Sequence, residues 1–220
     1  MIKSLVAGSM LAAAVASVAS AGFTGYSVQR NVTVGGNIQY QVFANWDQSG
    51  LVFLNAFNFA TQSGTMNARH QDSFTADGEV GTWQAGASVS AADRGEDSWV
   101  TASGLATSSG WGSALDPGFA NGGTVGDINN GAGWYDATPG TPNAIAAGGS
   151  QGGYRILLAQ IVRNGGELDA FATFYLKNAF KVAGTTTALF AEGTFTIGVV
   201  PAPGAMALLG VAGLAGRRRR

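Results

Sequence analysis

The chain has 220 residues with no cysteine and a single histidine, which excludes thiol catalysis, disulfide bonds and a zinc site with several histidine ligands. Five of its twelve basic residues lie at the two ends, Lys3 and Arg217 to Arg220, so seven basic and thirteen acidic residues remain between them. This body, with a net charge of −6, is not typical of nucleic-acid-binding proteins and favours solubility outside the cell, so we expect no nucleic-acid partner.

Residues 1–21 have the layout of a secretory signal peptide. Lys3 supplies the positive charge, and an almost uncharged run rich in Ala, Val and Leu follows from Leu5 to Ala19. Ala19-Ser20-Ala21 then places small residues at both recognition positions of a cleavage site. We therefore predict a signal helix that signal peptidase removes before Gly22, and an exported mature chain.

The body, residues 22–198, alternates strand-like runs with turn residues and is long enough for one domain. Ile38 to Trp46 alternates apolar and polar residues, which predicts a half-buried strand. The run LVFLNAFNFA, Leu51 to Ala60, follows across Asp47 to Gly50, which predicts a hairpin turn. Shorter candidate strands are Thr82 to Ala91 and Ser98 to Ala102.

Three strong candidate strands close the body: Tyr154 to Arg163, Leu168 to Val182 and Thr185 to Val199. Gly-containing turns separate them, which predicts an antiparallel meander. The 34 glycines disfavour helix, and no long segment between the two ends has a helical period. We expect an all-β fold, an antiparallel β-sandwich or jelly roll, flanked by the N-terminal signal helix and a C-terminal hydrophobic helix.

Residues 103–153 form a Gly-rich excursion within the body. The excursion retains aromatic residues, including Trp111 and Trp134, which favours a folded segment over a disordered linker. Exposed tryptophans stack on sugars, whereas most tryptophans of a β-sandwich lie in its core. Trp111 and Trp134 are therefore the candidate ligand-binding residues.

The chain ends, from residue 199 to 220, in a short apolar segment followed by arginines. Pro201, Ala202 and Pro203 precede a run of small and apolar residues from Gly204 to Gly216, and Arg217, Arg218, Arg219 and Arg220 follow. As a helix this run covers roughly 20 Å, short of the roughly 30 Å hydrocarbon core, which favours transient membrane insertion over a permanent anchor. A plain C-terminal anchor is the alternative.

This three-part tail resembles the PEP-CTERM sorting signal. The resemblance covers about 20 residues, and it implies that an exosortase, a membrane-embedded transpeptidase-like enzyme, cuts near Pro201 to Pro203 and releases the protein or transfers it to the cell surface or to exopolysaccharide. Ala202 stands where that family usually has Glu. In the body, the stretches DSWVTASG, ALDPGFANG, GAGWYD and GYRILLAQIV resemble uncharacterised exported bacterial proteins with sorting tails, which implies no activity.

Motifs that suggest chemistry are weak. Ser150 lies in a formal G-x-S-x-G match, but a loop precedes it and a strand follows, whereas a nucleophile elbow needs a strand before it and a helix after it. His70, in the polar stretch NARHQD, is expected to be a surface or loop residue. No EF-hand is present, and we expect no metal. A non-standard calcium site remains open, against the simpler role of Asp and Asn in turns; its candidate ligands are Asp116, Asp127, Asn129 and Asp136.

The sequence thus predicts an exported protein of the cell surface or extracellular matrix that is not an enzyme and needs no cofactor. Its partners are signal peptidase and an exosortase-like enzyme, and the tail inserts transiently in the membrane. The alternative is a carbohydrate-binding module that acts on exopolysaccharide.

Overall fold

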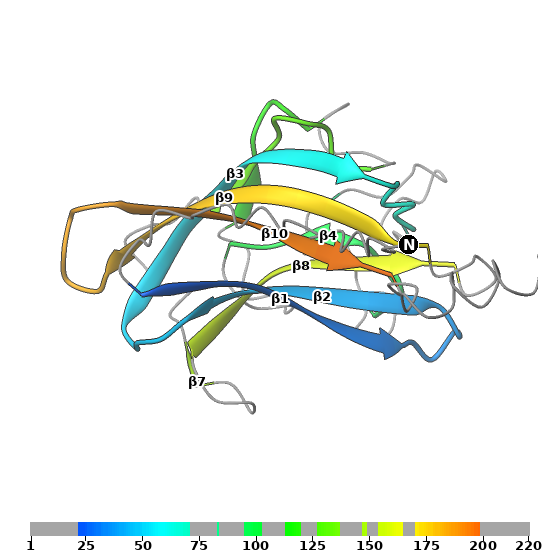
Figure 1. The fold of residues 1–220 in the computed structure, drawn as a ribbon, viewed down its shortest axis with the longest axis horizontal. Helices are drawn as coiled ribbons and strands as arrows, with labels where there is room; N and C mark the ends of the chain where they lie inside the picture. The colour runs from blue at the N-terminus through cyan, green and yellow to red at the C-terminus, as the bar shows by residue number, and fades with distance from the viewer. Residues whose placement is uncertain are drawn as a thin grey trace, which may run out of the picture.

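The computed structural model describes residues 22–70, 83, 95–102, 113–119, 127–136, 147–148, 154–164 and 170–198. These residues form two antiparallel sheets with almost no helix, so the prediction of an all-β fold is confirmed (Figure 1). In these ranges no helix has the length and apolar character that a membrane crossing needs. The two predicted flanking helices, residues 1–21 and 199–220, lie outside the described residues.

The first sheet, sheet A, has the strand order β1-β2-β8-β4, and β7 also pairs with β8. Every pairing is antiparallel, and β1 pairs with β2 from Phe23 opposite Trp46 to Val32 opposite Ile38. Its strands are β1 (Phe23–Val32), β2 (Ile38–Trp46), β4 (Trp99–Val100), β7 (Ala147–Gly148) and β8 (Tyr154–Arg163).

The second sheet, sheet B, has the strand order β10-β9-β3-β6-β5. Its two longest strands, β3 and β9, pair along most of their length with three register shifts. Figure 1 draws β3, β9 and β10 side by side. The strands of sheet B are β3 (Leu51–Ser63), β5 (Ser113–Leu115), β6 (Trp134–Asp136), β9 (Ala172–Val182) and β10 (Leu189–Ile197).

The period-two pattern of the sequence reflects the burial of alternate side chains. In β2 the side chains of Tyr40, Val42, Ala44 and Trp46 are buried, whereas the intervening Gln39, Gln41 and Asn45 are half-buried. The predicted strand over Ile38 to Trp46 is therefore confirmed with its bounds. The sequence pattern missed β1, because many of its residues are polar or small and few of its side chains are apolar. It also missed the short strands β5, β6 and β7 within residues 103–153.

The predicted connections between strands are partly wrong. The segment from Asp47 to Gly50 does not close a hairpin, because β2 lies in sheet A and β3 lies in sheet B. Likewise β8 and β9 belong to different sheets, so the predicted three-stranded meander is reduced to the antiparallel pair of β9 and β10. A short turn of polar and glycine residues serves equally well to reverse a strand within one sheet or to carry the chain to the other.

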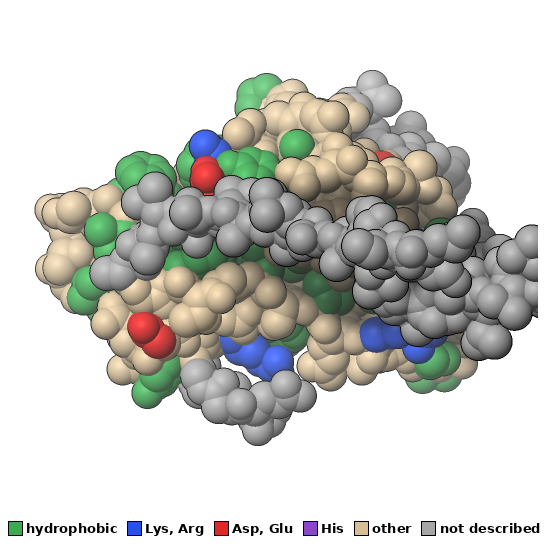
Figure 2. Space-filling model, in the orientation of Figure 1, with side chains coloured by type: hydrophobic (Ala, Val, Ile, Leu, Met, Phe, Trp, Pro, Cys, Tyr) green, Lys and Arg blue, Asp and Glu red, His purple; other side chains and the backbone are tan. Residues whose placement is uncertain are grey.

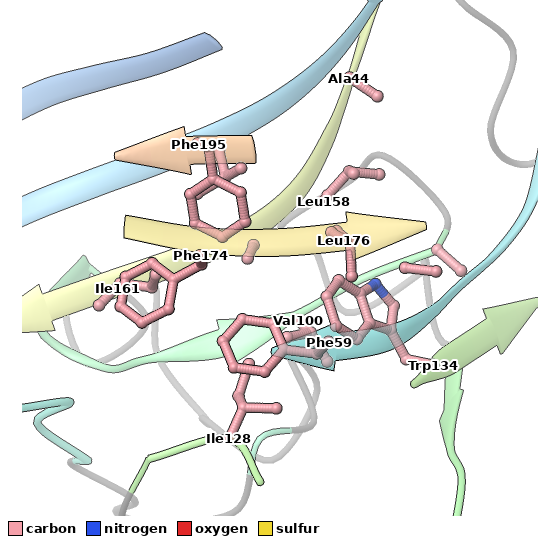
Figure 3. Packing of buried hydrophobic residues seen from close by; sticks show 14 of the residues in the cluster. Ala44, Phe59, Val100, Ile128, Trp134, Leu158, Ile161, Phe174, Leu176 and Phe195 are labelled. Atoms are coloured by element: carbon pink, nitrogen blue, oxygen red, sulfur yellow. The ribbon is translucent and has the colours of Figure 1, made fainter. Parts of the chain in front are cut away.

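Side chains from both sheets share one hydrophobic core. Trp46 of sheet A contacts Phe180 of sheet B, with ring centroids 5.7 Å apart. Tyr26 of sheet A contacts Phe195 of sheet B at 6.1 Å. In Figure 3 the labelled side chains of β2, β4 and β8 face those of β3, β6, β9 and β10.

The described parts of the Gly-rich excursion contain the strands β5, β6 and β7. Strands β5 and β6 pair with each other and extend sheet B beside β3. Phe119, Ile128 and Trp134 from this excursion are buried in the same core.

Candidate functional site

The structure places Trp134 in the interior. Its side chain is 2% exposed, and its Nε1 donates a hydrogen bond to the carbonyl oxygen of Thr101 at 3.1 Å. Its ring contacts Phe119 at 6.4 Å. A buried ring has no free face for a sugar, so the structure does not support Trp134 as a ligand-binding residue. Trp111, the second candidate, lies outside the described residues.

His70 lies in a loop, as expected, but its side chain is buried rather than on the surface. Its ring packs edge-on against Trp83 with centroids 4.7 Å apart, and its Nδ1 lies 3.7 Å from Oδ1 of Asp97. Both side chains are almost fully buried. The side chains of His70 and Asp97 therefore lie in the interior of the described structure.

The candidate calcium ligands already make structural contacts. The carboxylate of Asp127 accepts hydrogen bonds from the backbone N–H groups of Met66, Asn67 and Ala68 at 2.9, 3.2 and 2.9 Å. Asp116 accepts one from the N–H group of Gly118 at 2.8 Å. In the described part of the chain, no three His, Cys, Asp or Glu residues are grouped so that they could hold a metal ion. Asn129 donates weakly to the carbonyl oxygen of Gly118, and Asp136 is buried in β6.

Other residues singled out in the sequence lie mostly outside the described part of the chain. Ser150 and the sorting residues Pro201 to Arg220 lie outside the described residues, as do Ala19 and Ala21. Gly22, the residue after the predicted cleavage position, is described, and its carbonyl oxygen accepts a hydrogen bond from the N–H group of Asp47 at 2.9 Å.

A cluster of aromatic side chains instead lies on the outer surface of sheet B. We call it the aromatic face. It combines four rings from four neighbouring strands with one pair of opposite charges. Its members are Phe57 of β3, Tyr135 of β6, Tyr175 and Lys177 of β9, and Phe190 and Glu192 of β10.

Strand alternation puts these side chains on one face. In β9 the residues Phe174, Leu176 and Phe180 are buried, so Tyr175 and Lys177 between them point away from the core. Register then aligns the strands, because Lys177 lies opposite both Phe57 and Glu192.

The two most exposed rings mark the ends of this face. Phe190 is 62% exposed, and Tyr135 is 43% exposed. They lie on strands separated by β9 and β3, so three inter-strand spacings, roughly 14 Å, separate them. Phe57 lies between them and packs edge-on against Phe190 with ring centroids 6.3 Å apart.

The polar groups of the aromatic face are held in place by one another. The Tyr175 hydroxyl donates a hydrogen bond to Oε2 of Glu192 at 2.7 Å, and the Lys177 ammonium lies 3.1 Å from the same oxygen. The Tyr175 hydrogen bond and then Lys177 lower the pKa of the Glu192 carboxyl. Glu192 in turn raises the pKa of Lys177, so both groups are charged at neutral pH.

Two hollows adjoin Glu192. One, of about 490 Å³, is lined by Phe57, Lys177, Phe190, Ala191 and Glu192. The other, of about 480 Å³, lies where β1 of sheet A meets β10 of sheet B, and Phe23, Tyr26, Gln62, Tyr175 and Thr194 are among its lining residues. In Figure 2 a basic and an acidic side chain lie side by side among hydrophobic side chains, over the region where Figure 1 draws β3 and β9.

Comparisons with known proteins give no further guide. No protein-family model matches this chain, and neither the curated proteins nor the solved structures include a match. Function is therefore inferred from the arrangement of the side chains.

The aromatic face has the chemistry of a binding surface. Exposed rings offer stacking area, and an ionised carboxylate, an ammonium and hydroxyl groups offer hydrogen bonds. Sequence reasoning missed this face because it ranked tryptophans first. The sequence nevertheless contains an indication of this face. Phe190 lies two residues before the polar Glu192, and Tyr175 lies two residues after the polar Thr173, so each ring is on the outward side of its strand.

Proposed function

We propose that this chain is an exported protein of the cell surface or extracellular matrix without catalytic activity. An N-terminal signal peptide and a C-terminal sorting tail direct it there. Signal peptidase cuts before Gly22, the tail pauses in the membrane, and an exosortase-like enzyme processes it near Pro201 to Pro203. The observation that carries this proposal is the order Pro-Ala-Pro, short apolar run and four arginines at the end of a chain that begins like a signal peptide.

For the body we propose a β-sandwich of the jelly-roll type. The shared core supports this architecture, because rings of sheet A contact rings of sheet B. Edge strands β1 and β10 also meet where Gly193 of β10 passes over the ring of Tyr26, and a Cβ at residue 193 would lie 3.3 Å from that ring.

The test of delivery is the intact mass of the mature protein recovered from the producing cells. A mass that begins at Gly22 and ends near Pro201 to Gly204 supports sorting and processing. A mass that retains Arg220 would overturn processing and leave a plain anchor. Replacement of Arg217 to Arg220 by alanine should abolish processing, whereas the matched control Ala202→Glu should preserve it.

A second candidate function is carbohydrate binding, and the aromatic face favours it. The four rings and the Glu192–Lys177 pair provide on one open surface what the predicted pair of tryptophans was expected to supply. Its test is binding of the purified mature protein to exopolysaccharide from the same cells, measured by co-sedimentation. Absence of co-sedimentation would count against this function.

A further inference from the structure

We infer that the aromatic face binds an extended, uncharged oligosaccharide segment, with Phe190 and Tyr135 as the two outer stacking positions. This inference rests on the second candidate function, and it names the ligand class and the residues. Three observations carry it: the spacing of the rings, the balance of charge, and the exposure of polar groups beside the rings.

The spacing of the rings selects an extended ligand. Phe190 and Tyr135 lie on strands three spacings apart, roughly 14 Å, with Phe57 between them. A single sugar ring covers one aromatic side chain, so only a chain of sugars contacts both outer rings. Affinity should therefore rise with the number of sugar units until the ligand spans the face.

The balance of charge selects an uncharged ligand. Lys177 and Glu192 neutralise each other at 3.1 Å, so the centre of the face attracts neither an anionic nor a cationic polymer strongly. Lys181 lies four residues farther along β9, roughly 13 Å from Lys177. The Glu192 carboxylate, already oriented by Tyr175 and Lys177, is left to accept hydrogen bonds from sugar hydroxyls.

The exposed area argues against a second copy of this chain as the occupant. A stable dimer buries roughly 800 Å² on each partner. The exposed fractions of Phe190 and Tyr135, 62% and 43%, add up to about one whole aromatic side chain, on the order of 200 Å². The Lys177–Glu192 pair lies beside the Phe57–Phe190 contact and adds charge to this part of the face.

The experiment uses the mature protein as it is recovered from cells and a panel of neutral hexasaccharides: glucans, mannans, galactans and xylans. Binding is measured by isothermal calorimetry, with the monosaccharides and an alginate hexamer for comparison. We expect at least one neutral hexasaccharide to bind, and its monosaccharide to bind at least tenfold more weakly.

Variants locate the binding site. Phe190→Ala and Tyr135→Ala should each weaken binding by about three- to tenfold, a size typical of the loss of one aromatic contact. Tyr175→Phe should weaken it less, because only the hydroxyl is removed. Val34→Ala, at a fully exposed apolar residue in the turn between β1 and β2, is the matched control and should leave binding unchanged.

Four outcomes would overturn the inference. These are no binding to any neutral hexasaccharide, binding that Phe190→Ala and Tyr135→Ala leave intact, preference for the alginate hexamer, and self-association that Phe190→Ala abolishes. None of these outcomes bears on the proposed export and processing, because the intact mass of the mature protein tests those separately. A protein that is processed normally but binds no sugar would refute this inference and leave the proposal of export standing.

Discussion

Glu96 connects the turn between β1 and β2 to the segment that precedes β4. One carboxylate oxygen accepts a hydrogen bond from the N–H group of Gly35, and the other accepts from Thr33 Oγ1 and Asn37 Nδ2, each at 2.7 Å. Partial burial raises the pKa of this carboxyl, but the hydrogen bonds from Asn37, Thr33 and Gly35 outweigh it, so the pKa lies below its ordinary value of 4.5. The folded protein therefore favours the ionised form.

We expect Glu96→Gln to lower the free energy of unfolding at pH 7 by about 1–3 kcal/mol, since it weakens three charge-assisted hydrogen bonds. The contribution of Glu96 is complete above pH 4.5 and is lost as the pH falls through its lowered pKa. Urea unfolding at pH 7 and below pH 4.5 measures this, and the two proteins should converge in acid. Glu192→Gln, at an exposed ion pair, is the control; an equal loss there would contradict the assignment.

Single residues also show what the sequence could and could not predict. Burial of Tyr40, Val42 and Trp46 follows from alternation, because a strand between a core and solvent must place apolar residues at every second position. The burial of Trp134 and the exposure of Phe190 were not predicted. Tryptophan is a frequent sugar contact by residue type alone. Whether a ring points inward or outward depends instead on its position in the alternation of its strand.

At the scale of elements, the strongest strands were predictable and their partners were not. β8 occupies the predicted residues Tyr154 to Arg163, and β9 ends at the predicted Val182. Alternation is a local property, so it identifies a strand without naming its sheet. The longest pairing of β8 is with β2, more than 100 residues away, and the adjacent β9 lies in the other sheet. Long-range pairing of this kind depends on the packing of the whole core.

Strand β6 approaches β3 closely at Gly133, the residue just before β6 begins. A Cβ at this residue would lie 2.6 Å from the carbonyl oxygen of Ala56 and 2.9 Å from Cα of Phe57. We expect Gly133→Ala to push β6 away from β3 and to cost about 1–3 kcal/mol of stability, the usual cost of overpacking. Thermal unfolding should show a melting temperature lower by roughly 2–12 °C.

The control for this variant is Gly95→Ala, because a Cβ at Gly95 would meet no atom within 4 Å. Its melting temperature should stay close to that of the original chain. Equal melting temperatures for the two variants would show that β6 does not pack closely against β3.

At the scale of the whole molecule, one hydrogen-bonded tyrosine connects the two sheets. Tyr26 of β1 donates its hydroxyl hydrogen to the carbonyl oxygen of Leu176 in β9 at 3.1 Å, and the hydroxyl oxygen accepts from Asn178 Nδ2 at 2.7 Å. The ring also packs edge-on against Phe23 and Phe195. Burial raises the pKa of this hydroxyl well above its ordinary value of 10.0. The neutral hydroxyl is thus part of the interface between the sheets.

We expect Tyr26→Phe to lower the free energy of unfolding at pH 7 by about 1–3 kcal/mol, because Asn178 and the Leu176 carbonyl each lose a partner in the interior. The contribution of Tyr26 is complete below pH 10 and is lost as the pH rises above it, since only the unfolded chain ionises there. Urea unfolding from pH 7 to pH 11 should show a steeper alkaline loss for the original chain than for this variant. Tyr135→Phe, which removes an exposed hydroxyl, should keep the original slope. If Tyr26→Phe keeps that slope too, the hydroxyl of Tyr26 does not hold the sheets together, and ring packing alone joins them at this edge.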